Sequence, residues 1–276
     1  LFLTMNGADL WIQQNAPDYN YIKAGSFPIS QFILPLFDGI SSNIVFIIER
    51  VAWWLHIIGI LCFLNYLYYS KHLHIILAFP NTYFANLNPK GKFSNLESVT
   101  KEVKMMLDPS ADPFAASSNQ EIAKFGASDV FDLNKIQLLN AYTCTECGRC
   151  TSECPANLTG KKLSPRKIMM DTRDRLEEVG RNIDLNKGDY KSDGKELLND
   201  YISKEELWAC TSCNACVEAC PIGIDPLSII MDMRRYLVME KSDAPMELNN
   251  MMSNIENNGA PWPFNQMDKL NWKNEL

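Results

Sequence analysis

The sequence lacks an excess of positive charge, a cleavable signal peptide and more than a few histidines. Its 26 lysine and arginine residues are outnumbered by 33 aspartate and glutamate residues, so the 276-residue chain has a formal net charge of −7. This acidic balance argues against nucleic acid as a partner, because binding to the phosphate backbone needs a surplus of basic side chains. The length suggests about two structural units. The start at Leu1 and the abrupt end at Leu276 suggest a segment of a longer protein.

Eight of the nine cysteines form two copies of the pattern CxxCxxCxxxCP, with Pro155 and Pro221 as the final residues. In this spacing three thiolates bind one [4Fe-4S] cluster, and the cysteine before the proline binds the other cluster. The sequence therefore predicts two clusters with crossed ligation. One is expected to be held by Cys144, Cys147, Cys150 and Cys220, and the other by Cys210, Cys213, Cys216 and Cys154.

The main alternatives for these cysteines are a zinc site and a disulfide framework. Zinc usually takes separated CxxC or Cys/His pairs, and disulfide frameworks are typical of small secreted domains, so both fit this spacing less well. A compartment that keeps thiols reduced is needed to build iron–sulfur clusters, which places the cysteine region in the cytoplasm. The ninth cysteine, Cys62, lies in an apolar segment and is interpreted as a packing residue.

An apolar run extends from Val51 to Tyr69 and contains no ionised side chain. A run of about 20 apolar residues matches the hydrocarbon core of a bilayer, which is about 30 Å thick. Tryptophans near one end and tyrosines near the other are typical of the two membrane interfaces. The sequence therefore predicts a transmembrane helix that begins near Ser41 or Ser42 and continues to Pro80.

All three histidines, His56, His72 and His74, fall within this predicted helix. In a continuous helix, His56 and His74 would share one face and stand about 27 Å apart along the axis. Ionisable residues inside a membrane span usually have a function, and this arrangement suits one axial ligand for each of two haems. We therefore expect His56 and His74 to bind haem. The alternative is that His72 and His74 are interfacial polar residues, which need no special cause.

Two segments of the chain carry a family resemblance. WLH at 54–56 followed by YSKHLHI at 69–75 resembles the last helix of the nitrate reductase gamma-type cytochrome b family, in which two such histidines bind a distal and a proximal haem b. The double cysteine motif, with SKHLHIILAFPN at 70–81 and NNGAPWPF at 257–264, resembles the membrane-bound Fe–S oxidoreductases related to heterodisulfide reductase. These include the electron-transfer-flavoprotein:quinone oxidoreductases of bacteria.

The resemblance implies a distal haem at His56, a proximal haem at His74, and a location in the cell inner membrane with the cluster domain on the cytoplasmic side. It implies an electron-transfer flavoprotein or another dehydrogenase and a quinone as partners. It also implies further transmembrane helices, which would supply the second axial histidines, and a C-terminal CCG-type domain. The 276 residues contain neither, so no disulfide chemistry is assigned to any residue.

The expected fold is mainly α-helical, with a transmembrane helix from a cytochrome b-type bundle followed by an α-helical ferredoxin domain that holds two [4Fe-4S] clusters. Capping residues predict helices that start after Ser164, Ser203 and Asp225, the first of them ending at Gly180. The expected divisions are an extracytoplasmic segment 1–43, the transmembrane helix 44–80, a linker 81–135, the dicluster domain 136–240 and a connector 241–276.

Three further segments carry expectations. The run DPSADPFAASSN at 108–119 predicts an extended linker, and Asn186–Lys195 predicts a flexible surface turn. Lys71, Lys90 and Lys92 place positive charge after the span, which agrees with a cytoplasmic cluster domain. A group of six basic side chains lies after the first cysteine motif: Lys161, Lys162, Arg166, Lys167, Arg173 and Arg175. These side chains could bind an acidic partner, stabilise the anionic clusters, or form a solvated helix face.

Two functions from different classes fit these observations. The first is a redox enzyme segment that transfers single electrons between a cytoplasmic flavoprotein or dehydrogenase and the quinone pool, through two clusters and haem b. No side chain is assigned a catalytic role, because the chemistry resides in the metal groups. The second is a non-catalytic Fe–S anchoring subunit of a membrane complex. The chain also suits the electron-input part of a heterodisulfide-reductase-like enzyme.

Overall fold

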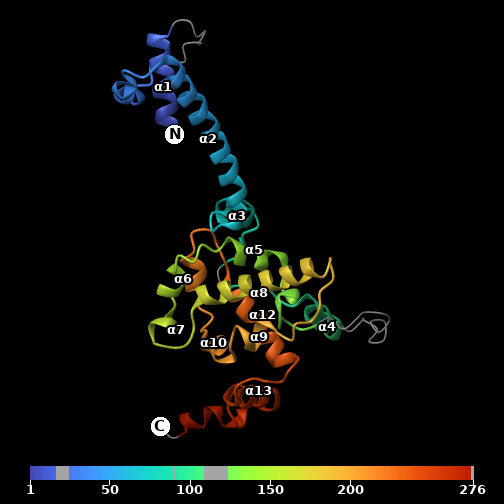
Figure 1. Ribbon diagram of the computed structural model, residues 1–276. Coiled ribbons are helices and arrows are strands. Elements are labelled where there is room, and N and C mark those ends of the chain that lie inside the picture. Colours follow the sequence, from blue (N-terminus) through green and yellow to red (C-terminus); the bar gives the residue numbers. More distant parts are fainter. Residues whose placement is uncertain (17–24, 90, 109–123, 275–276) are drawn as a thin grey trace. The chain divides into compact units, whose positions relative to one another are not determined.

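The computed structural model describes residues 1–16, 25–89, 91–108 and 124–274 (Figure 1). The predicted linker at 108–119 lies almost entirely outside the described residues, as does Lys90. The described part of the chain is helical and contains no strand, apart from one isolated bridge between Leu198 and Ile202. The expectation of a mainly α-helical fold is therefore confirmed. The chain divides into two compact units, Leu1–Leu73 and His74–Leu276.

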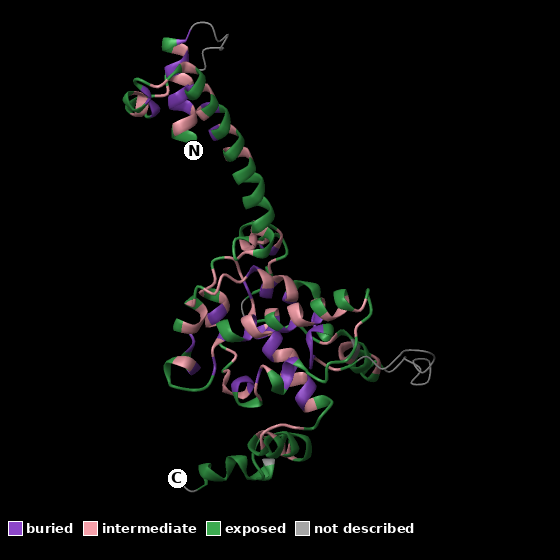
Figure 2. Ribbon diagram, viewed as in Figure 1, coloured by how far each residue is buried: buried purple, intermediate pink, exposed green. Residues whose placement is uncertain are grey.

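The first unit consists of α1 (Phe2–Asn15), the 3-10 helix η1 (Ser30–Phe37) and α2 (Ser42–Tyr69). Its small core lies where α1 packs on η1 and on the first half of α2, and includes Ile12, Phe37 and Val45. The second half of α2 exposes its apolar side chains, as the green ribbon in Figure 2 shows. Among the described helices, α2 alone is long and apolar enough to cross a membrane.

The start of the predicted span at Ser41 or Ser42 is confirmed, but its continuation to Pro80 is wrong. α2 ends at Tyr69, and a separate helix, α3 (Leu73–Tyr83), follows. Ser70 between them has an extended backbone, with φ −108° and ψ 163°. Its hydroxyl accepts a hydrogen bond from the His72 N–H at 3.3 Å, so a local side-chain bond replaces the continuing helix ladder.

The break changes the geometry expected for the two histidines. His56 lies on α2 in the first unit, whereas His74 lies on α3 and belongs to the second unit. The prediction that both residues share one face of a single helix is therefore wrong. Pro80 lies inside α3, and the neighbouring Asn81 donates a hydrogen bond to the backbone oxygen of Ile222 at 2.9 Å. This bond anchors α3 to the loop that follows the second cysteine motif.

The second unit is built mainly from helices of very different lengths. Two long helices, α8 (Pro165–Leu185) and α12 (Pro226–Met239), pack together and against α5 (Lys135–Thr143). Short helices carry the cysteine loops: α6 (Arg149–Ser152), α7 (Pro155–Leu158), α10 (Lys204–Ala209) and α11 (Ala215–Glu218). The remaining elements are α4 (Glu97–Leu107), η2 (Val130–Asp132), α9 (Leu197–Asp200), α13 (Met246–Asn258) and η3 (Gln266–Lys273).

The predicted helix starts are confirmed by their side-chain caps. Ser164 accepts a hydrogen bond from the Lys167 N–H, Asp225 accepts one from the Ser228 N–H, and Ser203 forms a capping box with Glu206. The predicted end of the first of these helices at Gly180 is wrong, because α8 continues to Leu185. Val179 is buried and Ile183 packs on the same core, so apolar burial on this face outweighs the cost of about 1 kcal/mol for an internal glycine.

Arg175 is fully buried and organises one side of this core. Its guanidinium donates two hydrogen bonds to Asp129, at 3.0 and 2.8 Å, and two to Asp193, at 2.5 and 3.1 Å. Further bonds go to the Tyr190 hydroxyl and the Lys195 backbone oxygen. The interpretation of the basic group as a solvated helix face is therefore wrong for Arg175. The segment Asn186–Lys195, predicted to be a flexible turn, is instead tied to the core.

Removal of one partner from this network should destabilise the fold. We expect Asp129→Ala to lower the free energy of unfolding by about 3 kcal/mol or more, because a buried charge loses its main partner. The measurement is urea denaturation of the purified protein followed by circular dichroism. The control is Glu205→Ala, which removes an exposed ion pair with Lys162 and should cost less than about 1 kcal/mol. Equal midpoints for the two variants would contradict a structural role for the network.

Candidate metal centre

The two cysteine motifs form loops with the same backbone shape. Cys144 ends α5 and Cys210 ends α10, and each loop then passes through two left-handed residues before a short helix begins. The φ angles are 59° at Glu146 and 84° at Gly148 in the first loop, and 57° at Ser212 and 61° at Asn214 in the second. Non-glycine residues adopt this conformation only when the surroundings require it. The repeated shape therefore indicates two loops built to curve their thiols around a common kind of group.

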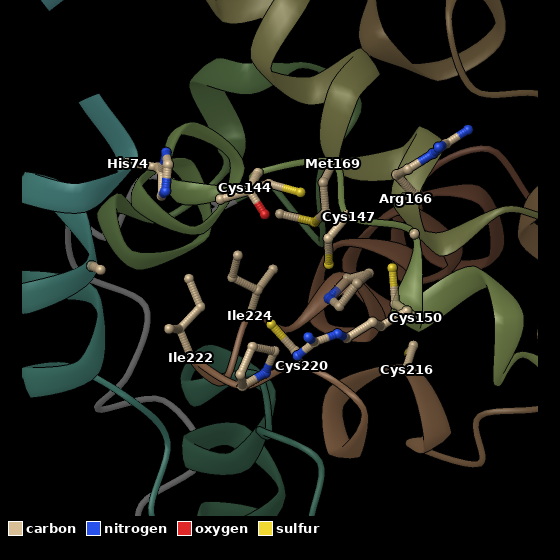
Figure 3. Close-up of a pocket in the computed structure, with 16 residues that line it drawn as sticks. His74, Cys144, Cys147, Cys150, Arg166, Met169, Cys216, Cys220, Ile222 and Ile224 are labelled. Carbon is tan, nitrogen blue, oxygen red and sulfur yellow. The ribbon is translucent and has the colours of Figure 1, made fainter. Parts of the chain in front are cut away.

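The first cavity has a volume of about 250 Å³ and is lined by cysteines from both motifs (Figure 3). Cys144, Cys147 and Cys150 come from the first motif, and Cys220 comes from the end of the second. Their sulfur atoms point into the same space, which Ile222, Ile224 and Met169 also line. One motif alone therefore does not complete this cavity.

The second space is bordered by Cys210, Cys213 and Cys216 of the second motif and by Cys154 of the first. It is narrow, with a volume of about 10 Å³, so these side chains must move apart to admit a four-iron group. Cys216 borders both spaces. The fourth cysteine of each motif thus lies with the first three of the other motif, which is the arrangement that crossed ligation requires.

The donor sets fit clusters better than the two alternatives. None of the nine cysteines forms a disulfide. Over the described ranges, no three His, Cys, Asp or Glu side chains are close enough to hold a single metal ion. Zinc needs four donors within about 2.3 Å of one point, whereas a four-iron cluster is held by thiolates spread around a larger body. Cys62 lies exposed on α2 and belongs to neither set.

Burial makes most of these thiols hard to ionise without a metal. Burial raises the pKa of the Cys216 thiol to about 12, and the charge of neighbouring Cys210 adds to this effect. Burial also raises the pKa of Cys144, Cys150 and Cys210. Thiolates are the form that binds iron, so positive metal ions must offset the cost of burying this charge. Cys213 differs, because a hydrogen bond from the Ala215 N–H lowers its pKa.

The structure places the three histidines in different surroundings. His74 lines the first cavity together with Ala78 of the same helix, next to the cysteines. The ring of His56 packs against the ring of Phe2, with centroids 5.7 Å apart. His72 is exposed, and its ring lies 6.3 Å from that of Phe63. The sequence pattern predicted His74 beside a haem and gave no sign of its position on the wall of a cysteine-lined cavity.

Comparison with known proteins identifies the cysteine region. Residues 143–224 match the family described as 4Fe-4S dicluster domain. The chain therefore contains a dicluster domain with two [4Fe-4S] clusters. The probable iron-sulfur-binding oxidoreductase FadF of Bacillus subtilis is 32% identical over 91% of this chain and 37% of its own length. The EtfAB:quinone oxidoreductase of Syntrophomonas wolfei is 27% identical over 92% of this chain and 35% of its own length.

A probable membrane-anchored ferredoxin of Chromohalobacter salexigens is 31% identical over 56% of this chain and 25% of its own length. Heterodisulfide reductase subunits of Methanosarcina match shorter parts of the chain. The chain is thus related to Fe–S oxidoreductases. It spans just over a third of the length of the first two relatives. The haem b domain expected from the resemblance is not supported by these comparisons.

Proposed function

We propose that the chain transfers single electrons between a cytoplasmic flavoprotein or dehydrogenase and a membrane quinone. The observation that carries this proposal is the pair of crossed cysteine sets within a dicluster domain. The names of two relatives, a probable iron-sulfur-binding oxidoreductase and an EtfAB:quinone oxidoreductase, support the reaction class and the partners. The apolar helix α2 and the membrane-anchored ferredoxin support a location at the inner membrane.

The proposed ligands follow the two cavities. Cluster I takes Cys144, Cys147, Cys150 and Cys220, and cluster II takes Cys210, Cys213, Cys216 and Cys154. The clusters supply reversible one-electron chemistry when bound. The protein holds the thiolates at fixed separations, excludes water with Ile222, Ile224 and Met169, and places charged groups around the sulfurs. No side chain needs to donate or accept a proton in this transfer.

The finer part of the proposal is that His74 and His56 each provide one axial ligand to haem b. The position of His74 on the wall of the cluster I cavity supports a short path from cluster I to a haem at this residue. The position of His56 on the candidate span supports a second haem within the membrane. The second axial ligands would come from other transmembrane helices.

A second candidate function is an Fe–S subunit that anchors to the membrane without haem. One contact favours it, because the ring of His56 packs against the ring of Phe2. A dithionite-reduced spectrum of the purified membrane form separates the two candidates. A b-type haem band supports the haem relay, and intact clusters without that band support the anchoring subunit.

The proposed function also requires iron and acid-labile sulfide at about eight atoms of each per chain, since each cluster contains four irons. Anaerobic purification followed by metal and sulfide analysis provides this test. Zinc in place of iron, or iron without sulfide, would contradict the proposal.

Crossed ligation predicts that a substitution in one cysteine motif damages the cluster held mainly by the other motif. Replacement of Cys154 by Ser should perturb cluster II, whose other ligands begin at Cys210, and should spare cluster I, which the neighbouring Cys150 holds. Paramagnetic resonance of the reduced protein should show loss or alteration of one of the two cluster signals. Cys62→Ser is the matched control and should leave both signals intact. Loss of the signal that depends on Cys144 in the Cys154 variant would refute the crossed assignment.

Replacement of His74 by Ala should interrupt electron transfer from the clusters to quinone while both cluster signals remain. The physical reason is that the proposed relay passes from cluster I to quinone through a haem held by His74. The measurement is quinone reduction by the membrane-bound protein, with His72→Ala as the control. Unchanged quinone reduction in the His74 variant would refute the proposed order of the relay.

A further inference from the structure

The two long helices of the second unit share a sequence pattern that the proposed function does not use. α8 begins at Pro165 and α12 begins at Pro226. Counted from the proline, both helices carry isoleucine three residues later, methionine five later, aspartate six later and arginine eight later. The matching pairs are Ile168 and Ile229, Met170 and Met231, Asp171 and Asp232, and Arg173 and Arg234.

Each arginine of this pattern contacts the loop of the cysteine motif that precedes its own helix. Arg173 Nη1 lies 2.8 Å from Glu146 Oε1, and Arg234 Nη1 donates to Ser212 Oγ at 3.3 Å. Glu146 and Ser212 occupy the same place, two residues after the first cysteine of each motif, and both have the left-handed conformation described above. The Ser212 N–H in turn donates to the Cys210 sulfur at 3.4 Å. The two arginines are therefore equivalent residues of an internal repeat.

The two arginines differ in their partners: among the residues that the structure describes, carboxylates pair with Arg173 but not with Arg234. Arg173 pairs with Glu146 and lies 3.4 Å from Asp174, so carboxylates offset its charge. Arg234 donates instead to the backbone oxygens of Leu207, at 3.0 and 2.6 Å, and of Cys210, at 2.5 Å. Its guanidinium also lies 5.0 Å from the ring centre of Trp208. Within the described ranges, no carboxylate forms an ion pair with Arg234.

Each arginine lies beside the first cysteine of its own motif. Arg234 donates to the Cys210 backbone oxygen at 2.5 Å, and Arg173 pairs with Glu146, two residues after Cys144. Arg173 and Arg234 are only partly exposed, so water screens their charges less than it screens exposed ones. Arg149 and Arg166 also line the cluster I cavity, but both are exposed. The carboxylate of Asp225 caps α12 near Cys216 and acts on cluster II with opposite sign.

We propose that Arg173 and Arg234 are equivalent positioning residues, one for each cluster. The residue that faces each arginine, Glu146 or Ser212, sets the net charge beside that cluster. Glu146 neutralises Arg173 beside cluster I, whereas Ser212 leaves the charge of Arg234 uncompensated beside cluster II. The proposal rests on the ligand sets of the proposed function. Reduction adds one electron to a cluster, and a nearby positive charge stabilises the reduced form. Arg234 therefore raises the reduction potential of cluster II, and this effect is cancelled at the equivalent position of cluster I.

The test is a reciprocal exchange of charge at the two equivalent positions, in the full chain with its clusters bound. Ser212→Glu should shift one of the two cluster transitions to lower potential. Glu146→Gln should shift the other transition to higher potential. The measurement is a redox titration of each variant followed by paramagnetic resonance. The charges of Arg149, Arg166 and Asp225 are unchanged in these variants, so their effects cancel in the comparison with wild type.

Three controls separate charge from size and from general surface effects. Ser212→Gln has nearly the size of Ser212→Glu without its charge, and should leave both transitions in place. Arg234→Gln should move the same transition as Ser212→Glu, in the same direction. Glu205→Gln removes one carboxylate from an exposed ion pair, and should move neither transition.

The outcomes distinguish this proposal from the proposed function. If both transitions are present and neither moves in Ser212→Glu and Glu146→Gln, the roles of the two arginines are refuted while the clusters stand. Equal movement of both transitions in either variant also refutes them. Absence of any cluster transition in the wild-type protein refutes the proposed function itself. If Ser212→Glu or Glu146→Gln loses its clusters, the comparison of Arg234→Gln with Arg234→Lys takes its place. Arg234→Lys keeps the positive charge, so its cluster transition should stay near the wild-type potential, whereas that of Arg234→Gln should be lower.

Discussion

Each cysteine-lined cavity of this protein is closed by a cysteine from the other motif. Cys220 borders the cavity of Cys144, Cys147 and Cys150, and Cys154 borders that of Cys210, Cys213 and Cys216. Neither half of the domain can complete a four-thiolate site alone, so the packing of α8 on α12 and the assembly of the metal sites depend on each other. The core that joins the two helices is well buried, with Ile168, Ile230 and Met233 almost inaccessible to water. A buried ion network around Arg175 holds the insertion between the motifs against α8.

Local physical chemistry predicted much of this domain. The cysteine spacing identified the dicluster region, and the caps at Ser164, Ser203 and Asp225 predicted where helices begin, because each cap is satisfied within four residues of its own position. The predictions that were wrong depend on distant contacts. Gly180 does not end α8, because Val179 and Ile183 are held by the core. Arg175 is not on a solvated face, because Asp129, which lies 46 residues earlier, binds it. The helix break at Ser70 is the exception, since a serine hydroxyl that competes for the backbone is a local signal that the apolar run obscured.

The internal repeat of α8 and α12 is visible in the sequence, but the predictions made from the cysteine and histidine patterns did not use it. Arg173 was counted with five other basic residues between Lys161 and Arg175 as one basic group, and Arg234 was not among the expected functional residues. Alignment of the two helices on Pro165 and Pro226 pairs Arg173 with Arg234 from the amino-acid sequence alone. The same alignment does not reveal that Glu146 and Ser212 face these arginines. That contact depends on the left-handed turns, which bring the third residue of each motif towards the helix that follows.

The position of His74 connects the metal sites with the candidate span. Only Ser70, Lys71 and His72 separate the end of α2 from α3, and α3 contributes both His74 and Ala78 to the wall of the first cavity. The apolar helix is therefore continuous in sequence with the wall of cluster I, and has no such link to the second cysteine set. Under the proposed function, this continuity in sequence favours cluster I as the cluster that exchanges electrons with the membrane partner. The proposed effect of Arg234 would then act on the other cluster, cluster II, where a raised reduction potential favours the reduced form.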